Sequence, residues 1–127
     1  FFLTNMKKIV LICTVLLMVV NVKSQSCKEL MDYVKQEGGY GTTYTSYNSD
    51  AISKVTFYEI RIEYKTYYFA IVCFKNSYYG CTEYIYQVAS NTKMNYAMNY
   101  INSAGKAFWE YIQPHHDNLE CSPDFDN

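Results

Sequence analysis

The residues of this chain that could bind a metal or act as bases lie close to its C-terminus. His115 and His116 are the two histidines of the sequence, and Asp117, Glu120 and Cys121 follow them. Adjacent histidines on an extended segment point to opposite sides, and neither an i, i+4 histidine pair nor a Cys-x-x-Cys motif accompanies them. The spacing therefore predicts a solvated tail, with no metal site and no cofactor.

The sequence holds no set of residues typical of an enzyme. A Gly-x-Ser-x-Gly elbow is absent, and no cysteine stands at a catalytic spacing from a histidine. Glu59 and Glu63 are four residues apart within a predicted strand, which is typical of a solvated face and not of an acid and base pair. We predict no catalytic residue. If the protein is a small enzyme, its best candidates are the two histidines.

Two tyrosines and a Ser-x-Gly-Lys sequence could bind a ligand. Tyr84 and Tyr86 are two apart on a predicted strand, so their rings share a face and could stack on a base, a sugar or a proline. Packing in the core is the alternative that we favour. Ser103, Gly105 and Lys106 lie where a helix should begin, so free backbone N–H groups there could bind an anion. A serine cap and a glycine that permits close packing are the ordinary explanation, which does not require Lys106.

The first residues have the pattern of an export signal. From Met6 the chain reads two lysines, an apolar stretch over residues 9–20 and a polar exit that ends at Ser24. The apolar helix would span roughly 18 Å, short of the ~30 Å hydrocarbon layer of a membrane. We therefore predict a cleaved signal over residues 6–24, preceded by translated upstream sequence at residues 1–5, and no stable membrane span in the mature chain.

Export makes the mature protein secreted or periplasmic. A lipoprotein acylated at Cys27 is the lesser alternative, because its signal would place an apolar residue where Ser24 stands. Removing the signal leaves eight basic and twelve acidic residues and a formal charge of −4. Nucleic-acid binders rely on Lys and Arg to neutralise phosphates, so a nucleic-acid partner is not expected.

Four cysteines remain in the mature chain, an even number that is typical of an oxidising compartment. Three connectivities are possible. A hairpin centred on Ser77 would place Cys73 opposite Cys81, which leaves Cys27 to pair with Cys121. The alternative is that Cys73 is a buried free thiol.

The periodicities predict one α+β domain: an N-terminal helix, a three-stranded antiparallel meander and a C-terminal helix in two pieces. A helix is expected from Cys27 to Glu37, and the polar segment from Tyr40 to Asp50 is a loop or an edge strand. A strand follows, and a change of parity at Tyr58-Glu59 suggests a bulge. A turn at Lys65-Thr66 leads to a central strand, Tyr67 to Phe74.

A turn from Asn76 to Gly80 then precedes the third strand, Thr82 to Val88. The first part of the C-terminal helix should bury one stripe, made of Met94, Ala97, Met98 and Ile101. The second part, Lys106 to Ile112, should bury Phe108, Ile112 and Trp109 and end at Pro114.

Three blocks in this order form a recognisable pattern: Ser49-Asp50-Ala51-Ile52, the Tyr84-Ile85-Tyr86 pair followed by Val88, and a last block of Ser103, Gly105, Lys106, Phe108 and Ile112. The pattern resembles the KTSC domain, a short module found in bacterial proteins and at the C-terminus of some lysyl-tRNA synthetases. It would cover residues 49–112, between a helix and loop at 25–48 and a tail at 113–127. Trp109 stands where the family commonly has Asn. For this family RNA binding has been suggested.

We therefore expect a small exported module that binds an extracytoplasmic peptide, glycan or anionic group and has no enzymatic role. The excess of tyrosine over the needs of a small core favours this hypothesis. The alternatives are RNA binding, which the resemblance alone implies, and a small enzyme.

Overall fold

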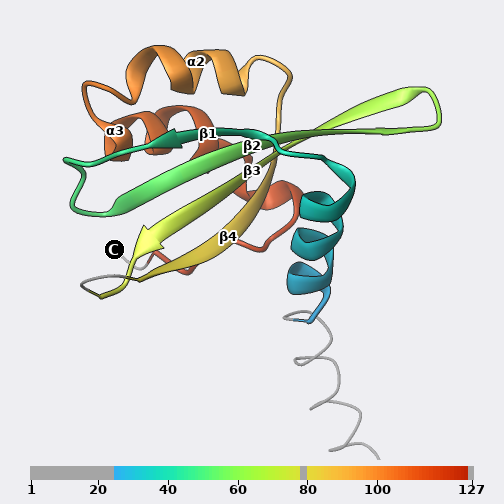
Figure 1. Ribbon diagram of the computed structural model, residues 1–127, viewed down its shortest axis with the longest axis horizontal. Coiled ribbons are helices and arrows are strands. Elements are labelled where there is room, and N and C mark those ends of the chain that lie inside the picture. The colour runs from blue at the N-terminus through green and yellow to red at the C-terminus, as the bar shows by residue number, and fades with distance from the viewer. Residues whose placement is uncertain (1–24, 78–79, 126–127) are drawn as a thin grey trace, which may run out of the picture.

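The computed structural model describes residues 25–77 and 80–125, so the predicted signal at 6–24 and the upstream residues 1–5 lie outside it. The fold is α+β, as predicted. One antiparallel sheet, in the order β1-β2-β3-β4, has helices on both faces (Figure 1). The N-terminal helix, described over residues 25–37, precedes the sheet. The other elements are β1 (Thr42–Thr45), β2 (Ile52–Ile62), β3 (Lys65–Lys75), β4 (Cys81–Val88), α2 (Thr92–Asn99), α3 (Ala104–Ala107), the π-helix η1 (Phe108–Ile112) and the 3-10 helix η2 (Gln113–Asn118).

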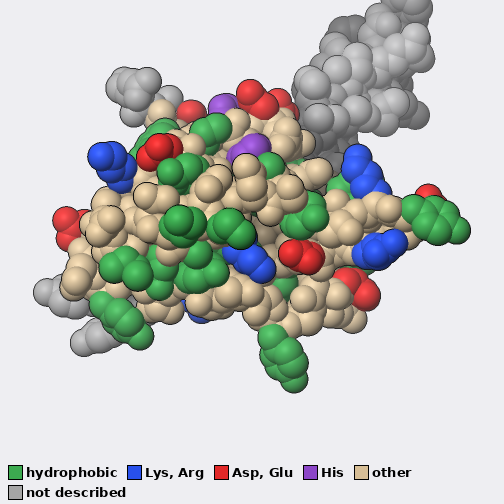
Figure 2. Space-filling model, turned by 90° about the horizontal axis from the view of Figure 1, so that it is seen from above, with side chains coloured by type: hydrophobic (Ala, Val, Ile, Leu, Met, Phe, Trp, Pro, Cys, Tyr) green, Lys and Arg blue, Asp and Glu red, His purple; other side chains and the backbone are tan. Residues whose placement is uncertain are grey.

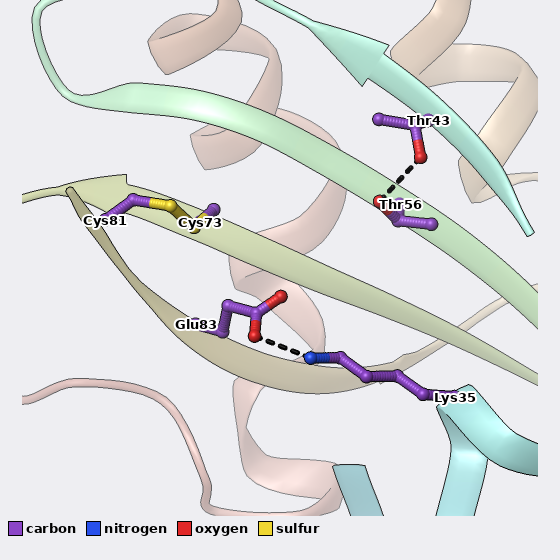
Figure 3. Close-up of polar contacts among 6 residues, drawn as sticks. All are labelled: Lys35, Thr43, Thr56, Cys73, Cys81 and Glu83. Carbon is purple, nitrogen blue, oxygen red and sulfur yellow. Dashed lines mark hydrogen bonds and ion pairs between the residues drawn. A yellow bond between two sulfur atoms is a disulfide. The ribbon is translucent and has the colours of Figure 1, made fainter. Parts of the chain in front are cut away.

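The sheet has four strands where the sequence predicts three, because the polar segment after the first helix contributes the edge strand β1. Thr42 pairs with Phe57 and Tyr44 with Val55. The Tyr44 ring packs against Phe57 on the face that α2 and α3 cover. On the opposite face the exposed hydroxyls of Thr43 and Thr56 are hydrogen-bonded at 2.8 Å (Figure 3). An edge strand with one wet face needs few apolar residues, which is why composition suggested a loop.

The predicted bulge at Tyr58-Glu59 is wrong. Tyr58 and Glu59 pair in unbroken register with β3, and the one register shift of this ladder lies between Ile52 and Lys54. The apolar parity of β2 changes because different elements cover the two faces of the sheet. Val55 belongs to the core beneath α2 and α3, and Ile60 to a second core beneath the N-terminal helix.

The β2–β3 turn also differs from prediction. Ile62 pairs with Lys65, so Glu63 and Tyr64 form the turn and Lys65 already belongs to β3. Glu63 has a φ of 59°, a conformation that usually selects Gly or Asn. Because Glu63 fills this position, no sequence signal marked the turn.

Three of the four residues in the stripe predicted for the first part of the C-terminal helix point to solvent. Met94, Met98 and Ile101 are 67%, 72% and 80% exposed, whereas Tyr96 is fully buried. Tyr96 packs against Phe57 and stacks on Tyr100 with centroids 5.5 Å apart. Two large aromatic rings bury more area than methionines do, and they set the orientation of the helix.

The second part of the predicted C-terminal helix begins before Lys106 and continues beyond Ile112. Phe108 and Ile112 are buried as expected, but Trp109 is 52% exposed. Pro114 does not end the helix, because it lies near the start of η2, where a missing N–H costs nothing. η2 is held on the sheet by Asn118, whose Nδ2 donates to the Gln87 carbonyl at 2.8 Å.

The cysteines form the two pairs that hairpin geometry favours, Cys73–Cys81 and Cys27–Cys121 (Figure 3 shows the first). Cys73 is not directly opposite Cys81, however. Its partner in the ladder is Glu83, so the disulfide joins diagonal neighbours whose Cα atoms are 5.3 Å apart. A sulfur that bonds Cys121 leaves no thiol for a lipid, so acylation of Cys27 is incompatible with the second bridge.

Candidate functional site

The candidate tyrosines of β4 pack against other rings. Tyr86 is 1% exposed and meets Phe108 edge-on with centroids 5.6 Å apart. Burial raises its pKa, and the neighbouring Tyr84 adds to the rise. Tyr84 is partly buried beside Phe74, with centroids 5.8 Å apart. Tyr86 therefore has no ring face open to a ligand.

Ser103 and Gly105 line a pocket of about 590 Å³. It lies between residues 45–51, which run from the end of β1 to the start of β2, and residues 100–105, which run from the end of α2 into the first turn of α3; we call it the loop–helix pocket. Ser103 caps α3, since its Oγ accepts a hydrogen bond of 3.1 Å from the Lys106 N–H. The side chain of Lys106 is exposed, and Lys106 is not among the lining residues.

Gly105 is not explained by close packing. A Cβ added there would meet no atom within 4 Å, and its φ lies outside the left-handed region. In a helix such a glycine costs roughly 0.5–1 kcal/mol relative to alanine. Because Gly105 borders the loop–helix pocket, its lack of a side chain leaves that space open.

The lining of the loop–helix pocket mixes polar and apolar side chains, and Asp50 is its one charged residue among those described. Asn48, Asp50 and Asn102 make no side-chain hydrogen bond to any described residue, so their polar atoms are free for a ligand. Tyr47 and Tyr100 add aromatic surface, and no Lys, Arg or His is among the described residues that line the pocket. Sequence reasoning missed these residues apart from Asp50, which the KTSC-like block contains. The available signal was two short runs of Ser, Asn and Asp, far apart in the chain, that only the fold brings together.

One lining residue, Ser46, has a buried hydroxyl close to that of Tyr96. Ser46 is 9% exposed and Tyr96 is fully buried. Neither Ser46 Oγ nor Tyr96 OH meets hydrogen-bond geometry with any described partner. Burial raises the pKa of Tyr96 to about 12, although the nearby Ser46 hydroxyl opposes the rise.

The histidines are in η2, outside the loop–helix pocket. The Nδ1 atom of His116 is 3.2 Å from an Asp117 carboxylate oxygen, and Cys121 is bonded to Cys27. Within residues 25–77 and 80–125, no three His, Cys, Asp or Glu side chains are grouped so that they could hold a metal ion.

Comparison with known proteins returned no match: no family model, no curated protein and no solved structure resembles the chain significantly. The part of the chain that the structure describes contains no helix that is both long and apolar enough for a membrane span.

Proposed function

We propose that this protein is an exported, non-enzymatic binding module and that its loop–helix pocket takes an uncharged, hydroxyl-rich ligand such as a glycan. The observation that carries the proposal is the lining itself: free amides and a carboxylate beside tyrosine rings. Amide and carboxylate groups exchange hydrogen bonds with sugar hydroxyls, and an aromatic ring packs on the apolar face of a sugar.

The lining argues against an anionic ligand at this pocket. Among the described lining residues Asp50 brings a negative charge and none brings a positive one, and the Lys75 ammonium beside them already donates to the Ser49 carbonyl. The anion site expected from Ser103, Gly105 and Lys106 loses its cation, because Lys106 stands outside. We therefore retain Ser103 and Gly105 in the proposed site and leave Tyr84, Tyr86 and Lys106 out of it.

Secretion to the periplasm or beyond the cell supports a glycan partner. Both disulfides join elements on the face that the N-terminal helix covers, and bonds of this kind persist in oxidising compartments. RNA binding, which the KTSC resemblance implies, is not favoured. On the face that carries α2, Lys and Arg side chains are scattered among acidic ones and form no continuous basic patch (Figure 2).

A glycan array probed with the mature chain, followed by calorimetry on the best ligand, tests the proposal. Asn102→Ala should weaken binding about five- to tenfold, the worth of one hydrogen bond. Asn91→Ala is the matched control, because Asn91 is exposed at the start of α2 and its side chain makes no capping bond. Equal affinities for the two variants, or no glycan bound by the native chain, would refute this placement of the site.

Gly105→Ala separates binding from folding. An added methyl group meets no atom of the described residues within 4 Å and removes the helix cost of glycine, so stability should rise by about 0.5–1 kcal/mol. Ligand affinity should fall, because the methyl group lies beside the loop–helix pocket. A variant that is more stable and binds as well as the native chain would contradict the proposal.

A further inference from the structure

A second pocket, of about 670 Å³, lies along the outer edge of β4. Its lining includes consecutive residues from Cys81 to Ile85, whose side chains alternate between the two faces of the sheet. A pocket that touches both kinds of side chain opens on the strand edge and not on a face. Met31 of the N-terminal helix and Ser122 of the tail form its other walls. We call it the edge slot.

Alternate residues of β4 direct their backbone N–H and C=O groups away from β3 and into the edge slot. Gln87 accepts a hydrogen bond from Asn118 of η2, so its carbonyl points away from β3. In an antiparallel strand the N–H and C=O of one residue point to the same side, and alternate residues share that side. Glu83 and Ile85 therefore present their backbone donors and acceptors outward, where β4 has no neighbouring strand among the described residues.

The register of the β2–β3 hairpin independently shows which residues of β4 direct their backbone groups outward. Ile62 and Lys65 close a two-residue turn, which makes them a hydrogen-bonded pair. Counting in steps of two, the odd residues of β3 bond to β2 and the even ones to β4. Ala70 is then bonded to Tyr86, so the odd residues of β4 face outward.

We propose that the edge slot binds an extended peptide, which adds to β4 as a fifth strand. A peptide backbone offers the alternating donors and acceptors that this edge lacks, and such addition is a recurrent mode of recognition. Side chains on one face of the peptide would meet Met31 and Ile85, and those on the other would meet Tyr84 and Ser122. A second copy of the chain fits less well, since its own helix and tail would accompany its β4.

Charge in the edge slot gives the peptide a preferred composition. Glu83 is engaged by Lys35, with Nζ to Oε1 at 2.6 Å (Figure 3). Lys28 and Glu120 also line the slot. Lys28 is exposed and makes no ion pair with a described residue, whereas Glu120 already has an interaction partner. We therefore expect the bound peptide to be apolar at alternate positions and to carry an acidic group facing Lys28.

The experiment pans a library of random heptapeptides against the immobilised mature chain. Glu83→Pro removes an outward N–H at a position where an edge strand tolerates proline, and Glu83→Ala controls for the loss of the carboxylate and its Lys35 ion pair. Peptides enriched on the native chain should bind the alanine variant with an affinity within about threefold and the proline variant at least about tenfold more weakly. Thermal unfolding shows whether the proline variant is folded.

N-methylation of each amide of the best synthetic heptapeptide keeps the proposal falsifiable if Glu83→Pro does not fold. Strand addition predicts that every second methylation abolishes binding and the intervening ones do not. The proposal is overturned if no peptide is enriched, if the losses lack this period of two, or if a folded proline variant binds normally. It is also overturned if ultracentrifugation shows a dimer that peptide does not dissociate.

Discussion

Replacing Cys27 and Cys121 together by alanine opens the bridge that joins the N-terminal helix to the C-terminal tail. The two cysteines are 94 residues apart in sequence. In the chain-entropy model, a loop of that length lowers the entropy of the unfolded chain enough to stabilise the fold by about 4.7 kcal/mol. This value is an upper estimate, and it is a large fraction of the roughly 5–15 kcal/mol that holds a domain together.

The measurement is urea unfolding of the oxidised mature chain, of each single Cys→Ala variant and of the double variant. Each single variant loses the same bridge, so all three should be destabilised almost equally, by about 3–5 kcal/mol, and in a parallel thermal unfolding experiment Tm should fall by roughly 12–40 °C. Single effects that add up to the double effect would refute the reasoning, because additivity means that the two sites act independently.

Further predictions concern Tyr96, the capping serine and the short disulfide loop. Tyr96→Phe removes a buried hydroxyl whose described neighbour, the Ser46 hydroxyl, does not meet hydrogen-bond geometry with it, so the free energy of unfolding should change by less than about 1 kcal/mol or rise; a loss above about 2 kcal/mol in urea unfolding would contradict this. The pKa of Tyr96 is raised to about 12 from an ordinary 10, so its contribution is complete below pH 10 and is lost as the pH rises towards 12. Native protein should therefore lose more stability between pH 9 and 11.5 than Tyr96→Phe does, and equal losses would exclude this cause. Ser103→Ala should cost about 1 kcal/mol through loss of the α3 cap, and a neutral result by thermal unfolding would show that the cap does not stabilise α3. Cys73→Ala with Cys81→Ala opens a loop of 8 residues, so its bridge contributes only about 2.5 kcal/mol.

The sequence predicted those features that depend on local pattern. The N-terminal helix and the strand that is now β4 have apolar periods of 3.6 and 2. The cysteine pairing follows from one hairpin and an even number of cysteines. The edge strand β1 was predicted only as an alternative, because pairing with β2 organises its threonines and no local signal does. The apolar side chains of β2 change from one face of the sheet to the other because helices cover both faces. A bulge within one strand would give the same sequence pattern, which is why the change was misassigned.

The candidate site was predicted less well than the fold. Ser103 and Gly105 were selected for an anion, but the pocket that they line depends on residues 45–51, half the chain away. The orientation of α2 decides whether Tyr96 or Met94 faces the sheet, and both satisfy a helical period. Three-dimensional packing made that choice by burying Tyr96 against Phe57.

The bridge between Cys27 and Cys121 also determines how the fold would respond to being stretched. Tension applied at Gln25 and Phe125 enters the domain two residues before one cysteine and leaves it four residues after the other. It therefore passes through a covalent bond that joins Cα atoms 5.7 Å apart, and the ladders of the sheet carry almost none of it. While that bond is intact the sheet cannot be unzipped from these ends, whereas a reductant would expose every strand to the load.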